Sequence, residues 1–303
     1  MNIICQQKFA DLHDGDRIFY SASSPGKCKE IFEEIKNLDH EVILISGTED
    51  HHVGKIESSN TEYRQINYIF DNVPQNVKYW FTQNNVTRRD NIIPIPLGMR
   101  NGHPSSKRPA DSSGWDWVVG QHKVLENIYL NDNSSPTKFL YVNYCNRPEH
   151  RKKVTEICQE YLNSPHHEAN LNYDVYTSHI LDHECAMSPI GMGVDCYRIY
   201  EILYCKRIPI TVKVGKIGEY YADCVPLSWT GTQYAPPQEE EYPIYTDLYP
   251  KFPIVMLDSI EELKDINHLK KLVEEQKNKE WDRNLLDFDY WKNLIYEYKN
   301  YLK

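Results

Sequence analysis

Short apolar runs that alternate with amphipathic stretches constrain the fold of this chain more than any other feature of its sequence. Runs of about four to eight apolar or β-branched residues are typical of strands, and apolar residues at a period of about 3.6 are typical of helices. In the first third, strands are expected at 17–20, 41–45, 78–82 and 92–98, with a helix at 27–38. Strands that alternate with helices pair in parallel, because each crossover turns the chain back to the same direction. The sequence therefore predicts an α/β fold.

A second series of the same kind begins after residue 137. The stretch 101–137 is rich in Ser, Pro, Asp, Asn and Gly, which break helices and strands, and it ends in Asn-Asp-Asn-Ser-Ser-Pro at 131–136. Beyond it, strands are expected at 138–144, 184–188, 208–212 and 253–258, and helices at 149–162, 195–205 and in the charged tail from 269 to 302. We therefore predict a first domain at 1–135, a second at 136–275 and a helical segment at 276–303.

Composition and charge exclude several classes of protein. The net charge of −10, with no basic run, argues against nucleic acid as a partner, since a phosphate backbone would be repelled. No stretch approaches the roughly 18 apolar residues that a membrane span needs. Met1–Gln7 lacks the features of a secretory signal, and the eight cysteines include no CxxC pair that would suggest zinc or a redox centre. We expect a soluble, cytoplasmic protein with its cysteines buried as small apolar side chains.

The segment 188–210 carries the clearest sign of a binding site. Its sequence, Ser-Pro-Ile-Gly-Met-Gly-Val-Asp at 188–195, links an expected strand to an expected helix. Gly191 and Gly193 would let the backbone approach a ligand and adopt positive φ. The N-terminus of the following helix would offer free N–H groups and a partial positive charge to a phosphate. The segment therefore predicts an anion-binding loop.

Three charged residues follow this loop at a regular spacing. Asp195, Arg198 and Glu201 lie three residues apart, so on one helix they would form a single polar strip. Arg198 could bind a diphosphate through a charge-assisted fork, and Glu201 could accept hydrogen bonds from ribose hydroxyls. A solvated helix face with ordinary ion pairs would show the same spacing. The dinucleotide fingerprint G-x-G-x-x-G fails here, because Cys196 stands at the position of its third glycine, and this argues against an NAD-dependent enzyme.

The same segment resembles the donor-site signature of exostosin-like GT-B glycosyltransferases. In that family a Ser-Pro-x-Gly-x-Gly-x-Asp loop precedes an Arg-x-x-Glu helix and an Ile-Pro-Ile/Val strand, and this chain has all three in order within 188–210. The stretches 80–84 and 93–98 are similar to the family's N-lobe pattern, and 138–144 with Arg151 is similar to the opening of its donor lobe. The resemblance spans residues 80–213. Met192 and Val194 fill variable loop positions, and Tyr200 stands where the family often has an aromatic or small residue. The N-lobe side is poorly matched, which leaves the acceptor unassigned.

The resemblance implies a GT-B fold, with two Rossmann-like lobes, an interlobe cleft and a C-terminal helix that returns to the N-lobe. It implies an enzyme that transfers a sugar from a nucleotide-sugar donor to a hydroxyl of a glycan acceptor, with inversion and without an essential metal ion or a cofactor. The donor would bind to residues of the C-terminal lobe, namely Asn143, Arg151, Ser188, Gly191, Gly193, Asp195, Arg198, Glu201 and Lys213.

Candidates for the remaining roles follow expected strands. Asp50 could be the general base that takes the acceptor proton, with Glu49 or His51 as substitutes, although a polar turn would explain the same residues. Such positions lie at the carboxyl ends of strands, where open α/β sheets bind ligands. Lys213 could neutralise the leaving diphosphate at a strand end, or could be an ordinary solvated lysine.

Two further hypotheses remain beside this one. A metal-dependent transferase of the GT-A type needs a D-x-D motif after a strand. Two segments match the D-x-D sequence, Asp14-Gly15-Asp16 and Asp287-Phe288-Asp289, but neither follows an expected strand. The first precedes a strand, and the second lies in the tail. The second hypothesis is a non-catalytic glycan- or nucleotide-binding module on a degenerate transferase fold.

Overall fold

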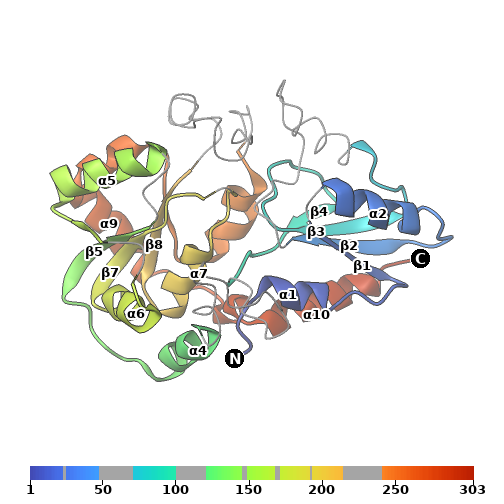
Figure 1. The fold of residues 1–303 in the computed structure, drawn as a ribbon, viewed down its shortest axis with the longest axis horizontal. Helices are drawn as coiled ribbons and strands as arrows, with labels where there is room; N and C mark the ends of the chain where they lie inside the picture. Colours follow the sequence, from blue (N-terminus) through green and yellow to red (C-terminus); the bar gives the residue numbers. More distant parts are fainter. Residues whose placement is uncertain are drawn as a thin grey trace.

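The chain forms two α/β lobes, each built around a parallel sheet (Figure 1). The computed structural model describes residues 1–22, 25–47, 71–99, 121–144, 149–167, 171–191, 193–213 and 241–303. Within these residues, the parallel α/β architecture expected from the alternating apolar runs is confirmed.

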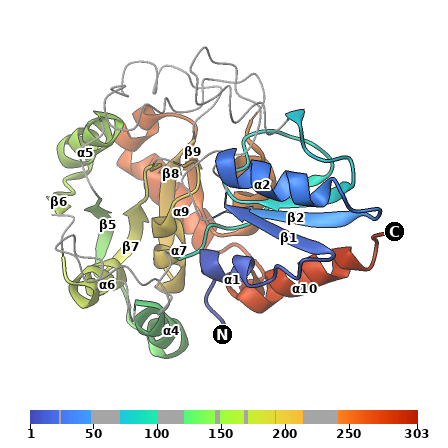
Figure 2. The ribbon, with the colours of Figure 1, turned by 45° about the vertical axis from the view of Figure 1, so that its right-hand side comes forward.

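The first sheet runs through its strands in chain order. Its strands are β1 (Ile18–Ala22), β2 (Val42–Gly47), β3 (Val77–Thr82) and β4 (Ile92–Pro94). Helix α2 (Pro25–Ile35) covers one face, while α1 (Gln6–Ala10) and α10 (Phe288–Lys299) lie on the other (Figure 2). Each β2 residue is buried because the sheet has helices on both sides.

Alternate side chains of β2 enter two separate apolar clusters. Leu44 packs with Phe32 of α2, whereas Ile43 and Ile45 belong to the large core that also contains Phe9 of α1. This alternation follows from the two-residue period of a strand. A run that reads as continuously apolar in sequence therefore serves both faces of the sheet.

The second sheet has a different strand order, β6-β5-β7-β8-β9. Its strands are β5 (Lys138–Asn143), β6 (His166–His167), β7 (His183–Met187), β8 (Ile208–Val212) and β9 (Val255–Leu257). The helices of this lobe are α5 (Glu149–Leu162), α6 (Tyr173–Leu181), α7 (Tyr197–Tyr204) and α9 (Ile266–Lys277), with the short turns η2 (Ile244–Leu248), η3 (Tyr249–Lys251) and η4 (Ile260–Lys264).

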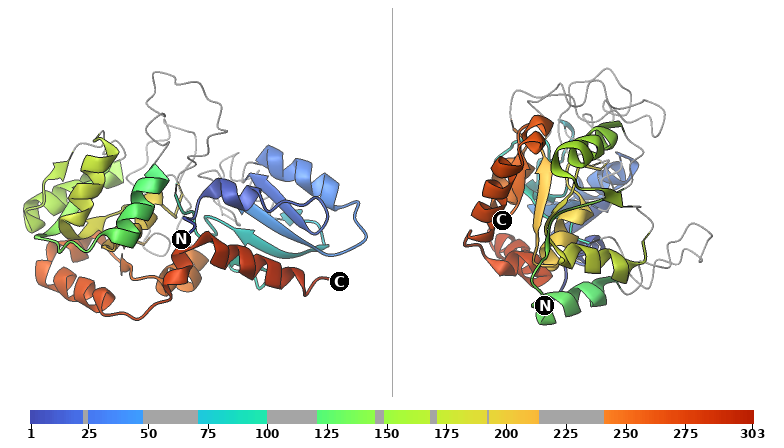
Figure 3. Two further views of the ribbon diagram at one scale, coloured as in Figure 1. Left: turned by 90° about the horizontal axis from the view of Figure 1, so that it is seen from below. Right: turned by 90° about the vertical axis from the view of Figure 1, so that its left-hand side faces the viewer.

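The end of the chain crosses from the second lobe to the first (Figure 3). The expected helical tail is two helices, α9 and α10, separated by the turn η5 (Arg283–Leu286). On α10, Tyr298 packs edge-to-face on Tyr79 and Phe81 of β3, at ring distances of 4.7 and 5.2 Å. Lys299 pairs with Asp14 at 2.7 Å. The last helix therefore completes the cover of the first sheet.

The N-terminal residues join several distant parts of the chain. Ile3 bridges to Asp287 and Cys5 to Met99. The N–H of Ile4 donates to the hydroxyl of Tyr204 on α7 at 2.9 Å. The first five residues thus lie where the two lobes and the tail meet.

Helix α4 (Gln121–Asn131) precedes the boundary expected at residue 135, yet it packs against α7 of the second lobe (Figure 1). Tyr129 of α4 contacts Tyr204 edge-to-face at 6.2 Å. The residues before 136 are therefore not confined to the first lobe.

Candidate functional site

The strand order of the second sheet identifies the place where a ligand is expected. From β5 the chain moves to β6 on one side and then crosses to β7 on the other. In open parallel sheets, ligands bind outside the carboxyl ends of the strands at such a reversal. Tyr141 of β5 pairs with Ala186 of β7. If this register continues for two more residues, Asn143 at the end of β5 lies beside Ser188, which directly follows β7.

Arg198, in the first turn of α7, points to this edge. Its Nη1 donates to the carbonyl oxygen of Asn143, and its Nε donates to the hydroxyl of Tyr176 at 3.2 Å. Within the described residues, Nη2 has no hydrogen-bond partner. Burial lowers the pKa of Arg198, but the neighbouring Tyr176 and Glu201 outweigh burial and leave the pKa raised. The guanidinium is therefore charged and fixed at two of its three nitrogens.

Glu201 lies one turn further along α7 and is held by the same tyrosine. The hydroxyl of Tyr176 donates to Oε2 of Glu201 at 2.7 Å. The other carboxylate oxygen, Oε1, has no partner among the residues that the structure describes. Arg198 and Glu201 thus each retain one atom that can bind a ligand.

Ser188 adds a third polar atom at this edge. It is fully buried, and its backbone N–H donates to the carbonyl of Ile210 at 2.8 Å. Its hydroxyl has no hydrogen-bond partner within the described ranges. A buried polar group without a partner costs about 1 to 3 kcal/mol, so a bound ligand that pairs with it would remove that cost.

Arg151 of α5 holds the loop that follows Ser188. Its Nε donates to the carbonyl of Ile190 at 3.0 Å and its Nη2 to that of Pro189 at 3.4 Å. A Cβ added at Gly191 would lie 3.4 Å from this Nη2, which is ordinary contact. The Arg151 side chain therefore holds the loop by its backbone carbonyl groups.

Asp195 lies at the contact between the lobes, not on the helix strip that its spacing predicted. Helix α7 begins at Tyr197 after the extended residue Cys196, so the prediction of one helical strip from Asp195 to Glu201 is wrong. The carboxylate is 2% exposed and accepts four hydrogen bonds, from the backbone N–H groups of Leu97 and Cys196 and from the hydroxyls of Tyr200 and Tyr249. All four are 2.7 or 2.8 Å long.

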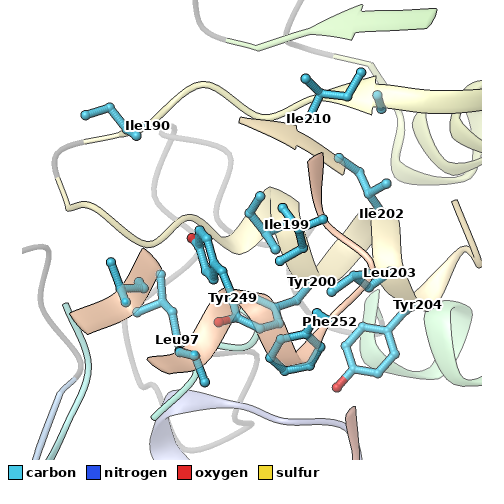
Figure 4. Packing of buried hydrophobic residues seen from close by; sticks show 14 of the residues in the cluster. Leu97, Ile190, Ile199, Tyr200, Ile202, Leu203, Tyr204, Ile210, Tyr249 and Phe252 are labelled. Atoms are coloured by element: carbon cyan, nitrogen blue, oxygen red, sulfur yellow. The ribbon is translucent and has the colours of Figure 1, made fainter. Parts of the chain in front are cut away.

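These partners surround Asp195 from both lobes. Figure 4 shows Tyr200 and Tyr249 beside Leu97 of the first lobe. Burial raises the pKa of Asp195 to about 6, while the hydrogen bonds act in the opposite direction. At pH 7 the residue is an ionised contact between lobes, with both oxygens occupied by protein donors.

Gly193 faces the same contact. A Cβ at this position would lie 2.5 Å from Oδ1 of Asn84, the atom that accepts the N–H of Asp195 at 2.9 Å. Gly191 and Gly193 were expected to adopt positive φ, but the described glycines with positive φ are Gly15 and Gly98. That prediction is wrong, and Gly193 is needed for the close approach of Asn84.

Lys213 follows β8 and is already paired. Its Nζ contacts the carboxylate of Glu241 and lies 2.5 Å from Oδ1 of Asp258. Burial lowers the pKa of Lys213, but these two carboxylates outweigh burial and raise it. Two carboxylates around one ammonium leave an excess of negative charge, so this group does not attract a diphosphate as it stands.

The expected general base, Asp50, lies outside the described residues, as do Glu49 and His51. In both D-x-D sequences the first aspartate binds backbone N–H groups. Asp14 accepts hydrogen bonds from the N–H groups of residues 16–18, and Asp287 is the N-cap of α10. The described part of the chain contains no cluster of three or more His, Cys, Asp or Glu that could hold a metal ion. It also contains no helix both long and apolar enough to cross a membrane.

Tyr176 is the main functional candidate that sequence reasoning missed. It lies on α6, outside every motif that drew attention, and only the fold brings it to Arg198 and Glu201. Asn84 and Leu97 lie within stretches noted for their resemblance, but nothing in those stretches indicated a contact with Asp195.

Neither a comparison with models of protein families nor one with curated protein sequences finds a match to this chain.

Proposed function

We propose that this chain is a glycosyltransferase of the GT-B type, resembling the exostosin-like family, and that its nucleotide-sugar donor binds at the carboxyl edge between β5 and β7. The observation that carries the proposal is the open hydrogen-bonding capacity at this edge: Nη2 of Arg198, Oε1 of Glu201 and the buried hydroxyl of Ser188. A cationic group that donates hydrogen bonds suits a diphosphate, and a carboxylate oxygen and a hydroxyl that form hydrogen bonds suit the ribose joined to it.

The proposed reaction joins an acceptor hydroxyl oxygen to the anomeric carbon of the donor sugar while the bond from that carbon to the diphosphate oxygen breaks. The acceptor proton passes to a general base, for which Asp50 stays our candidate. Arg198 stabilises the negative charge that develops on the departing nucleoside diphosphate. Asn143 and Arg151 act by orienting Arg198 and the loop after β7, and the acceptor is a glycan.

The lobe arrangement supports the proposal in a second way. The loop from Ser188 to Asp195 begins at the proposed donor edge and ends in the contact with the first lobe. A sugar donor that binds at the beginning of this loop would therefore lie close to the first lobe, which is proposed to hold the acceptor. Cys158, Cys185, Cys196 and Cys205 are free thiols, in keeping with the reducing cytoplasm as the proposed location.

The test is nucleotide binding in the presence of EDTA, measured as a shift in melting temperature over a panel of nucleotide sugars. A ligand at about 100 times its Kd should stabilise the protein by roughly 2.7 kcal/mol. Arg198→Ala should weaken binding about 10- to 150-fold, the equivalent of a charge-assisted hydrogen bond of roughly 1.5 to 3 kcal/mol. Glu201→Ala should act in the same direction, while Arg283→Ala, at an exposed arginine of η5, is the matched control.

If Arg198→Ala and Glu201→Ala bind nucleotide as the unaltered protein does, the assignment of the donor site is wrong. If nucleotide and glycan bind but no nucleoside diphosphate is released when donor and acceptor are mixed, the chain is a binding module.

A further inference from the structure

Tyr176 contacts both charged residues of the proposed donor site through a single atom. Its hydroxyl accepts a hydrogen bond from Nε of Arg198 and donates one to Oε2 of Glu201. The guanidinium carbon of Arg198 also lies 5.4 Å from the centre of the Tyr176 ring. The phenol therefore separates the two charges while it bonds to both.

Without this phenol, Arg198 and Glu201 would be expected to pair. They are three residues apart on α7, a spacing at which opposite charges form ion pairs on a helix. Yet no ion pair joins them in the part of the chain that the structure describes. A bidentate pair, in which Nε and Nη2 of Arg198 donate to the two carboxylate oxygens of Glu201, would occupy Nη2 and Oε1, which are now left for a ligand.

We infer that Tyr176 is a positioning residue, whose hydroxyl keeps Arg198 and Glu201 from pairing with each other so that each retains a hydrogen-bonding atom for a diphosphate and a ribose. This inference rests on the proposed function. It assigns to α6 a part in the donor site that none of the sequence motifs indicated.

The surroundings of Tyr176 suit this role. Its side chain is 7% exposed, and its ring packs against Tyr173 and Tyr141, at ring distances of 5.7 and 6.2 Å. Burial raises the pKa of Tyr176 well above its ordinary value, so the phenol keeps the proton that it donates to Glu201. A neutral group that both donates and accepts can bond to a cation and an anion together.

The experiment compares the affinity of inorganic pyrophosphate, measured by calorimetry, for five proteins. Tyr176→Phe keeps the ring and removes the hydroxyl, so Arg198 should pair with Glu201 and pyrophosphate should bind at least about tenfold more weakly. Tyr173→Phe is the matched control, because its hydroxyl is also buried but has no partner in the described structure. It should bind pyrophosphate as the unaltered protein does.

The last two proteins, a double variant and Glu201→Gln alone, separate this inference from a loss of packing. In Tyr176→Phe/Glu201→Gln, no carboxylate remains to pair with Arg198, so affinity should return to within about threefold of that of Glu201→Gln alone. A double variant as weak as Tyr176→Phe would overturn the inference, and so would a Tyr176→Phe variant with unchanged affinity.

A crystal structure of Tyr176→Phe gives a readout that needs no ligand. An Arg198–Glu201 ion pair in that variant supports the inference, and two side chains that remain apart overturn it. If the unaltered protein binds neither nucleotide nor pyrophosphate, the proposed function fails, and this structure still decides whether Tyr176 separates the two charges.

Discussion

Replacing Gly193 by alanine should disrupt the contact between the lobes. The added Cβ would lie 2.5 Å from Oδ1 of Asn84 and 2.8 Å from its Cγ, closer than such atoms approach. Asn84 is 1% exposed, so its side chain has little room to move away. Overpacking of this kind costs about 1 to 3 kcal/mol.

A second cost follows from the same movement. Oδ1 of Asn84 accepts the N–H of Asp195, and this buried donor would lose its partner if Asn84 shifts. An unsatisfied buried N–H costs about 1 to 3 kcal/mol. Gly193→Ala should therefore lower the free energy of unfolding by at least about 2 kcal/mol, measured by urea denaturation.

Gly191→Ala is the control in the same loop. Among the residues that the structure describes, its Cβ would meet only Nη2 of Arg151, at 3.4 Å, so the unfolding free energy should change by less than about 1 kcal/mol. Equal effects of the two substitutions would show that the contact with Asn84 does not limit this position, and our account of the loop would be refuted.

Two further predictions concern the lobe contact and the last helix. The pKa of Asp195 is about 6 in the folded protein against 3.8 as the ordinary value, so the folded state binds more protons between these pH values. The stabilisation from this protonation is absent above pH 6 and grows as pH falls to 4, by about 3 kcal/mol for about two pKa units. The unfolding free energy, measured by urea denaturation at several pH values, should show this gain for the unaltered protein but not for Asp195→Asn. The same dependence on pH in both proteins would contradict this prediction. Tyr298→Ala should lower the unfolding free energy by about 2 kcal/mol, because two aromatic contacts with β3 are lost, whereas Tyr296→Ala, at an exposed residue of the same helix, should change it by less than about 0.5 kcal/mol. Similar losses for both tyrosines in thermal or urea unfolding would argue against docking through Tyr298.

The elements with strong local patterns were predictable from the sequence. Helix α5 was expected at 149–162 and has those bounds, because Val154, Ile157, Cys158 and Leu162 recur at helical spacing and are all buried. The buried strands β2 and β8 were found for a similar reason, since runs of apolar and β-branched residues leave little alternative to a central parallel strand.

The strand order was not predictable by the same means. Strand β6 has two residues, too few for an alternating pattern, yet its pairing with β5 creates the reversal that locates the candidate site. Its position depends on tertiary contacts and not on its own composition.

The environment of Asp195 was missed for a related reason. Its three-residue spacing from Arg198 suggested a common helix, but the helix begins later and the carboxylate turns toward a backbone N–H at Leu97, 98 residues earlier in the chain. Local spacing carries no information about such a partner. The same holds for Tyr176 and its two charged partners on α7.

The return of α10 to the first sheet affects how the chain folds as it is synthesised. Strand β3 ends at Thr82 and α10 begins at Phe288, so the ribosome adds roughly 200 residues between them, which takes about 10 to 40 s at 5 to 20 residues per second. Throughout that interval the aromatic face of β3 that Tyr298 later covers lacks its partner. The first lobe to leave the ribosome is therefore among the last to be completed, and nascent chains that stop short of α10 should be the ones that chaperones retain.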